Sequence, residues 1–169
     1  MNSIFNRVSI RSFKNEKVEE EKIEKILRAA MQAPSAGNQQ PWEFIVVEDK
    51  NTLSNLSDMS PYAKFIKDAP IAIVVLGNTK RMRFPENWMQ DLGAATENIL
   101  LEITELGLGG VWATVAPLED RMNYISDVFS LPENIKPYCV IPIGYPVLNM
   151  KAKDRYDESK IHREEYREQ

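Results

Sequence analysis

The chain has 169 residues, of which 43% are hydrophobic and 27% are charged, and its formal net charge is −4. This balance is typical of one folded domain with a buried core, and it provides no basic field for binding nucleic acid. No apolar run reaches the roughly 18 residues that a membrane span requires, and residues 1–7 lack the features of a signal peptide. We therefore expect a cytoplasmic protein without nucleic-acid or membrane partners.

The first elements follow from the spacing of apolar residues. Residues 18–33 carry apolar side chains at helical spacing and predict an amphipathic helix, which Pro34 ends. A polar, turn-rich stretch at residues 34–42 follows. Residues 42–48 (WEFIVVE) then predict a strand, and residues 51–56 predict a short helix.

The second half of the chain continues this alternation. Residues 70–76 (PIAIVVL) are apolar nearly throughout and predict an interior strand, followed by a turn at Gly77-Asn78. Residues 88–107 predict a long helix, apolar around much of its circumference, with a left-handed cap at Gly107. The remaining predicted elements are a strand, a helix and a strand, at residues 111–115, 119–129 and 138–143.

This order predicts a sheet flanked by helices, in an α/β or α+β layered domain. No linker divides the chain, so residues 1–169 are expected to form one domain. Residues 147–169 are highly charged and have no core of their own. We expect them to form an arm that reaches over a partner subunit.

The chain is poor in side chains that perform chemistry unaided. It has one cysteine, Cys139, and one histidine, His162, so it can form neither an intrachain disulfide nor a zinc site of several such ligands. Cys139 lies in an apolar stretch and is expected in the core, while His162 lies in the charged C-terminal region and is expected at the surface. Ser35 has no histidine nearby in sequence, which disfavours a serine hydrolase.

A candidate anion site lies near the N-terminus. Arg7 and Arg11 share one face if this segment is helical, whereas Arg7, Ser9 and Arg11 lie on one side if it is extended. Either conformation would let guanidinium groups bind a phosphate. The alternative is two solvated arginines. Lys153 and Arg155 form a second basic pair, for which the alternative is again that both side chains are simply solvated.

Two common phosphate-binding motifs are absent from the sequence. The chain contains no Gly-x-Gly-x-x-Gly loop and no Gly-x-x-x-x-Gly-Lys run. A bound redox cofactor could nevertheless perform the chemistry, because the protein would then only have to anchor and polarise it.

Five motifs, in family order, resemble those of the FMN-dependent nitroreductase family. They span Arg7–Phe13, Ala33–Trp42, Gly107–Trp112, Ile143–Pro146 and Asp154–Tyr156. The resemblance implies an α+β, three-layer fold with a central, mostly antiparallel sheet flanked by helices. It also implies an intertwined homodimer with two interfacial FMN sites.

The resemblance assigns one set of residues to the phosphate end of FMN. Arg7 would hold the phosphate, helped by Ser9, Lys153 and Arg155. Val8 stands where the family often has a second arginine, so it can contact the cofactor only through its backbone.

A second set is assigned to the flavin ring. Arg11 would lie near the pyrimidine edge, where its charge would stabilise the reduced ring. The other subunit would contribute Pro34, Ser35 and Asn38, and one face of the ring would lie along Trp112, Ala113 and Thr114. No residue is assigned a catalytic role, because flavin N5 would be the reactive centre.

The function implied is transfer of hydride from NADH or NADPH, through FMN, to nitroaromatic, quinone or similar acceptors by a ping-pong mechanism. The alternatives are a flavin reductase, another specialised redox branch of the family, or a flavin-binding protein without turnover. Ala36 and Thr114 replace a frequent serine and a frequent glycine. Phe84, Trp88 and Met89 are expected to cap any acceptor pocket.

Overall fold

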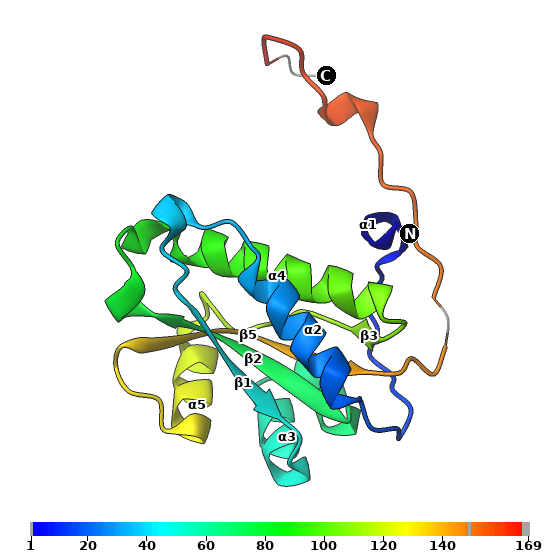
Figure 1. The fold of residues 1–169 in the computed structure, drawn as a ribbon, viewed down its shortest axis with the longest axis vertical. Helices are drawn as coiled ribbons and strands as arrows, with labels where there is room; N and C mark the ends of the chain where they lie inside the picture. The colour runs from blue at the N-terminus through cyan, green and yellow to red at the C-terminus, as the bar shows by residue number, and fades with distance from the viewer. Residues whose placement is uncertain (1, 149, 167–169) are drawn as a thin grey trace.

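The computed structural model describes residues 2–148 and 150–166, and Figure 1 shows a sheet covered on both faces by helices. Within these residues, the sheet has five strands. They follow the order β1 (Trp42–Val47), β2 (Ile71–Asn78), β5 (Ile135–Gly144) and β3 (Gly109–Gly110), and β4 (Ala113–Thr114) also pairs with β5. All these pairings are antiparallel.

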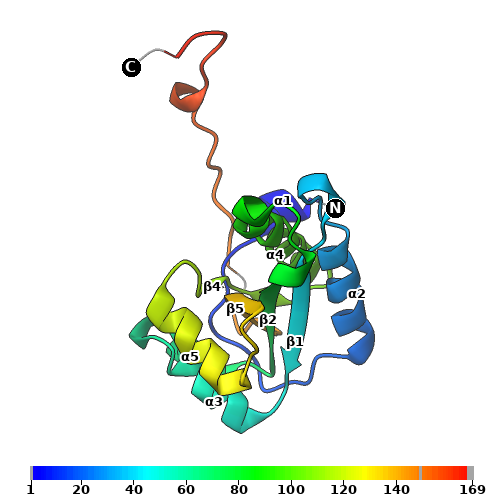
Figure 2. The same cartoon turned by 90° about the vertical axis from the view of Figure 1, so that its left-hand side faces the viewer.

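Helices cover the two faces of the sheet in different combinations (Figure 2). One face packs against α2 (Glu20–Met31) and α4 (Trp88–Glu105), and the other against α3 (Lys50–Ser57), α5 (Glu119–Phe129) and the 3₁₀ segment η2 (Pro61–Asp68). The predicted α+β, three-layer architecture is therefore confirmed. The short elements are α1 (Ser3–Asn6), η1 (Ala36–Asn38), η3 (Thr79–Arg81), η4 (Pro85–Asn87) and η5 (Glu158–Lys160).

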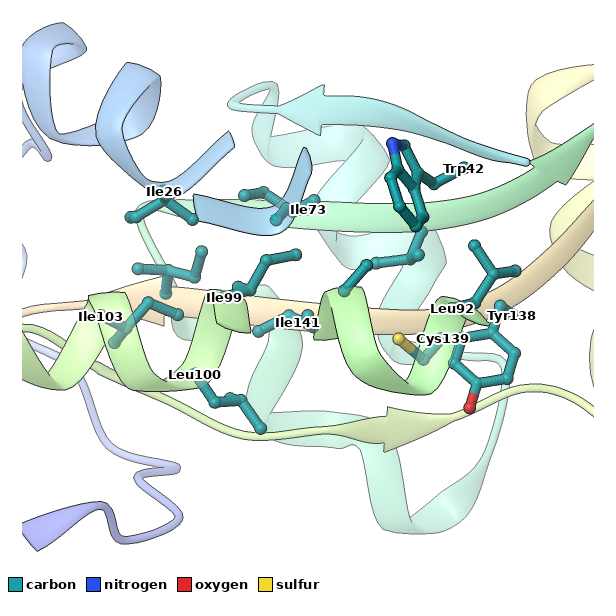
Figure 3. Packing of buried hydrophobic residues seen from close by; sticks show 14 of the residues in the cluster. Ile26, Trp42, Ile73, Leu92, Ile99, Leu100, Ile103, Tyr138, Cys139 and Ile141 are labelled. Atoms are coloured by element: carbon teal, nitrogen blue, oxygen red, sulfur yellow. The ribbon is translucent and has the colours of Figure 1, made fainter. Parts of the chain in front are cut away.

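Strand β2 is buried on both faces because its side chains alternate between two cores. Ile71, Ile73 and Val75 face one core, and Ala72, Val74 and Leu76 face the other. Helix α4 supplies much of the first core, and Figure 3 shows its side chains against β2 and β5. This double burial explains the continuous apolar run of the strand.

Cys139 lies in the first core and is fully buried (Figure 3), as predicted. Its Sγ is 3.5 Å from the Thr96 hydroxyl oxygen, and burial raises the pKa of the thiol to about 12. His162 is exposed, as predicted, and its ring lies near that of Tyr166. Neither residue therefore has the surroundings of a catalytic group.

Helix α4 ends in a left-handed cap, as predicted, although its last residue is Glu105 rather than Gly107. Gly107 has a φ of 71°. The Leu108 N–H donates to the Ile103 carbonyl at 2.9 Å, and the Gly107 N–H donates to the Thr104 carbonyl at 3.2 Å. This pair of hydrogen bonds is a Schellman motif, which satisfies the last carbonyls of the helix.

The predicted turn at Gly77-Asn78 is wrong, because β2 continues through both residues and pairs Gly77 with Lys136. A Cβ at position 77 would lie 2.9 Å from Met82 and 3.0 Å from Leu92. Glycine therefore allows close packing against neighbouring side chains here and does not form a turn.

The strand predicted at 111–115 is instead two short strands, β3 and β4, in one continuous register on β5. Gly110 pairs with Ile143 and Ala113 with Val140, so Val111 lies opposite Pro142. Proline has no N–H to donate, which interrupts the ladder at this point. β5 itself begins at Ile135, earlier than the predicted Tyr138.

The C-terminal arm leaves the body of the protein in Figures 1 and 2. Its side chains are exposed from residue 153 to 166, and residues 149 and 167–169 of the predicted arm lie outside the described residues. No helix in the described ranges is both long and apolar enough to cross a bilayer.

Candidate functional site

A cavity of about 240 Å³ opens beside β4 and brings together segments far apart in sequence. Arg11 from the N-terminal segment, η2 and α5 contribute its other walls. The lining residues are Arg11, Met59, Ser60, Tyr62, Ala63, Phe65, Val111, Trp112, Ala113, Thr114 and Arg121. Arg11, Trp112, Ala113 and Thr114 are therefore neighbours, as the sequence motifs imply.

The N-terminal segment reaches this cavity because it is extended rather than helical. Ser9 bridges to Gly110 in parallel, and the Ile10 N–H donates to the Gly110 carbonyl at 3.0 Å. Ile10 is buried while Ser9 and Arg11 are exposed, which is strand-like alternation. A Cβ at Gly109 would lie 2.7 Å from Ile10, so glycine at 109 allows this close approach.

Arg11 supplies positive charge at the cavity. Its guanidinium carbon lies 5.7 Å from the centroid of the Phe65 ring, at cation–π distance. Arg11 and Ser9 also line a second hollow of about 240 Å³ with Leu148 and Met150, at the start of the arm.

A second guanidinium at the cavity, that of Arg121, was not expected from the sequence. Its Nη1 donates to the Thr114 carbonyl at 2.9 Å, which ties α5 to β4. A cation in the first turn of a helix is disfavoured by the helix dipole. That local conflict is the sequence signal that marks Arg121.

Ser60 was also missed. Its side chain is 4% exposed, and its Oγ accepts a hydrogen bond from the Tyr62 N–H at 3.2 Å as the N-cap of η2. Residues 57–69 have no long periodic pattern that would place an element at the cavity. The Ser-Pro pair at 60–61, a common start for a helical turn, is the only local signal.

Arg7 lies against α4 and does not line the cavity. Its Nε is 3.6 Å from Glu97 Oε1, and its side chain is 24% exposed. Val8 is half-buried beside Ile10 and Phe13. Arg7 is therefore not simply a solvated arginine. Its role in binding phosphate stays a prediction.

Pro34, Ser35 and Asn38 lie in the loop between α2 and β1, which packs against the start of α4. Ser35 Oγ accepts a hydrogen bond from the Gln40 N–H at 3.0 Å, and Asn38 Oδ1 accepts one from Gln40 Nε2 at 2.9 Å. None of the three residues lines the cavity beside Arg11.

Lys153 and Arg155 lie on the exposed arm, and within the described residues their side chains have no hydrogen bond or ion pair. The protomer therefore does not join them to Arg7 or Ser9. Phe84, Trp88 and Met89 are not in the cavity lining either. Trp88 instead packs edge-on to Tyr138, with ring centroids 5.8 Å apart.

The cavity suits binding rather than unaided catalysis. Its lining contains two arginines, aromatic rings and strand backbone, but no carboxylate, histidine or cysteine. Within the described ranges, no group of three His, Cys, Asp or Glu side chains could hold a metal ion. Cations beside flat apolar walls favour an electron-rich aromatic ligand.

A model of the nitroreductase family matches residues 4–64 and 57–145 of the chain. A protein of Methanothermobacter thermautotrophicus, provisionally named NADH dehydrogenase/NAD(P)H nitroreductase, is 44% identical over 166 residues. The match covers 98% of this chain and 87% of that protein.

Two solved structures are similar over nearly their full length. A Clostridium acetobutylicum protein, provisionally described as an NADH oxidase, has a TM-score of 0.95 at 55% identity, covering 97% of this chain and 99% of that one. An FMN-dependent nitroreductase of Clostridium difficile has a TM-score of 0.90 at 35% identity, covering 98% and 100%. The chain therefore belongs to the nitroreductase family of oxidoreductase enzymes.

Proposed function

We propose that this protein is an FMN-dependent oxidoreductase that transfers hydride from NADH or NADPH to an electron acceptor. The observation that carries the proposal is the cavity that Arg11 lines together with Trp112, Ala113 and Thr114, without any carboxylate, histidine or cysteine. FMN, when bound, supplies the missing chemistry by accepting and releasing a hydride at N5. Similarity to the FMN-dependent C. difficile nitroreductase supports this assignment.

The residues present fit a flat, electron-rich ring. Trp112 and Phe65 offer aromatic surface, and Met59 adds a buried apolar wall. The Arg11 guanidinium would stabilise negative charge on the reduced ring, which favours accepting a hydride from the nucleotide. The backbone of Ala113 and Thr114 would lie along one face, which leaves the opposite face for substrates.

The phosphate end would be held by Arg7, Ser9, Lys153 and Arg155, with Val8 contributing only its backbone. Glu97 pairs with Nε of Arg7, so both Nη groups of the guanidinium fork can bind phosphate oxygens.

A homodimer would complete the site. The cavity of about 240 Å³ is smaller than the roughly 300–1,000 Å³ of typical small-molecule pockets. Ile4 and Phe5 are 68% and 71% exposed, which suggests an interface for this part of the protein. In the dimer, Pro34, Ser35 and Asn38 of one protomer would reach the FMN of the other, and residues 147–169 would cross onto the partner.

With one open face, nucleotide and acceptor would bind in turn, which gives ping-pong kinetics. We expect nitroaromatic and quinone acceptors, with free flavin as the alternative. The test is to load the purified protein with FMN and mix it anaerobically with NADH or NADPH. Steady-state rates with nitro, quinone and free-flavin acceptors would follow.

Rapid bleaching of a yellow protein, followed by reoxidation by one acceptor class, is the expected result. Protein that stays colourless after incubation with FMN would overturn the proposal. Yellow protein that both nucleotides bleach only very slowly would identify a flavin-binding protein without turnover.

A further inference from the structure

A buried carboxylate lies outside the cavity and has no part in the proposed chemistry. Asp91, in the first turn of α4, is 4% exposed. Both of its oxygens bind the loop between α2 and β1: Oδ1 accepts the Ala36 N–H at 2.8 Å, and Oδ2 accepts Gln39 Nε2 at 2.5 Å. A charge is seldom buried unless specific partners bind it by hydrogen bonds. Here both partners belong to the same loop, the one between α2 and β1.

Gln39 is held in a single orientation by a second segment. Its Oε1 accepts the Phe84 N–H at 2.8 Å, and its Nε2 donates to the Phe84 carbonyl at 3.1 Å. The Phe84 backbone therefore determines which end of the Gln39 amide faces Asp91. The Phe84 ring also packs on Gly37, where a Cβ would overlap it.

The loop held in this way has an unfavourable backbone. Gly37, Asn38 and Gln40 have φ values of 53°, 56° and 46°. Glutamine rarely adopts this left-handed region, and such conformations persist only where surrounding contacts impose them. Asp91, Gln39 and Phe84 supply those contacts.

The loop conformation leaves two donors available. Ser35 Oγ and Asn38 Oδ1 act as acceptors for Gln40 within the loop. In the described residues, neither the Ser35 hydroxyl nor the Asn38 Nδ2 group donates a hydrogen bond, so both can donate to another molecule. Asn38 is exposed.

We propose that Asp91 is a positioning residue for FMN in the partner subunit's site. It fixes the strained loop so that Ser35 and Asn38 present their donors to the acceptor-rich cofactor. The positive end of the α4 dipole stabilises the Asp91 carboxylate in this position. Asp91 itself does not touch FMN, and the inference rests on the proposed function, because that function places Ser35 and Asn38 at the cofactor.

The test measures FMN affinity by fluorescence titration and folding by circular dichroism and thermal melting without FMN. Asp91→Asn replaces an acceptor oxygen with a donor, and in either orientation of the amide this donor opposes another donor, the Gln39 Nε2 group or the Ala36 N–H. We expect the dissociation constant to rise about tenfold. Asp120→Asn is the matched control, because Asp120 is an exposed acid in the first turn of α5.

A reciprocal exchange separates positioning from a general effect on stability. Gln39→Glu alone sets two carboxylates against each other and should also weaken FMN binding. Asp91→Asn combined with Gln39→Glu restores one donor–acceptor pair and has the same net charge as the wild type, so it should recover part of the affinity. If Asp91→Asn does not fold, Gln39→Ala tests the same link.

The outcomes are distinct. Wild-type protein that binds no FMN would overturn the proposed function. If the wild type binds FMN, then unchanged affinity in Asp91→Asn, or in Gln39→Ala where that variant replaces it, would overturn the positioning role alone. A double variant that binds no better than either single variant would do the same.

Discussion

The two N-terminal arginines have different surroundings although they lie four residues apart. Arg7 pairs with Glu97 on α4, whereas Arg11 lies at the cavity beside Phe65. Local spacing cannot separate these positions, because it predicts only that the two side chains share a side. Their different partners agree with a division between phosphate and ring binding.

This division predicts that Arg7→Ala weakens FMN retention more than Arg11→Ala. Loss of charged hydrogen bonds to phosphate costs about 1.5–3 kcal/mol, which is roughly tenfold to 150-fold in affinity. FMN fluorescence titration measures the effect, with Arg28→Ala on the exposed face of α2 as a control. Equal losses for Arg7→Ala and Arg11→Ala would show that the division is wrong.

Cys139 provides a prediction about pH. Burial raises the pKa of its thiol from 9.0 to about 12, so the folded state keeps the proton after the unfolded state has lost it. The contribution of this protonated thiol to the free energy of unfolding is therefore fully present below pH 9. It decreases by about 1.4 kcal/mol per pH unit as the pH rises toward 12.

Urea unfolding at pH 8 and pH 10 tests this prediction, with Cys139→Ala as the comparison. The free energy of unfolding should fall less from pH 8 to pH 10 in Cys139→Ala than in the wild type. Tyr138, whose pKa is also raised to about 12, contributes to the fall in both proteins. Equal pH dependence in the two proteins would contradict it.

At the scale of elements, the approach of the N-terminal segment to β3 depends on Gly109. Gly109→Ala would place a Cβ 2.7 Å from Ile10, and we expect a loss of about 1–3 kcal/mol in the free energy of unfolding. FMN binding should weaken too, because Ser9 and Arg11 would move with Ile10.

Gly107→Ala is the comparison for Gly109→Ala. Nothing lies within 4 Å of its Cβ, so its cost comes only from the left-handed φ of 71° and is about 1–2 kcal/mol. Denaturation and FMN titration of both variants distinguish the cases. Unchanged FMN affinity in Gly109→Ala would show that the segment tolerates the added methyl group.

At the scale of the whole molecule, the arm is expected to serve the partner rather than its own protomer. Lys153→Ala combined with Arg155→Ala should weaken FMN binding at least tenfold while leaving the melting temperature of the FMN-free protein unchanged, because both side chains are exposed. Lys151→Ala, also on the exposed arm, is the control.

Analytical ultracentrifugation tests the dimer that this expectation requires. The wild type should sediment as a dimer at micromolar concentration, since exposed apolar residues such as Ile4 and Phe5 need a cover. A monomeric protein that nevertheless binds FMN tightly would refute the interfacial site.

The spacing of apolar residues predicted the elements with a regular pattern, which are α2, α4, α5 and the doubly buried β2, and it predicted a layered α/β or α+β domain. The three-layer α+β class came from the family resemblance. Side-chain periodicity is a local property, so it can be read along the chain. The resemblance to the nitroreductase family, rather than periodicity, assigned site roles to the polar loop at residues 34–42 and to the N-terminal arginines.

Which distant side chains meet depends on the tertiary structure. Arg121 with Thr114, Ser60 in the cavity wall, and Asp91 with Gln39 join segments separated in sequence. The split of the 111–115 strand likewise depends on Pro142 in the neighbouring strand. These contacts arise from packing and strand register, which place residues together without leaving a periodic signal in either segment alone.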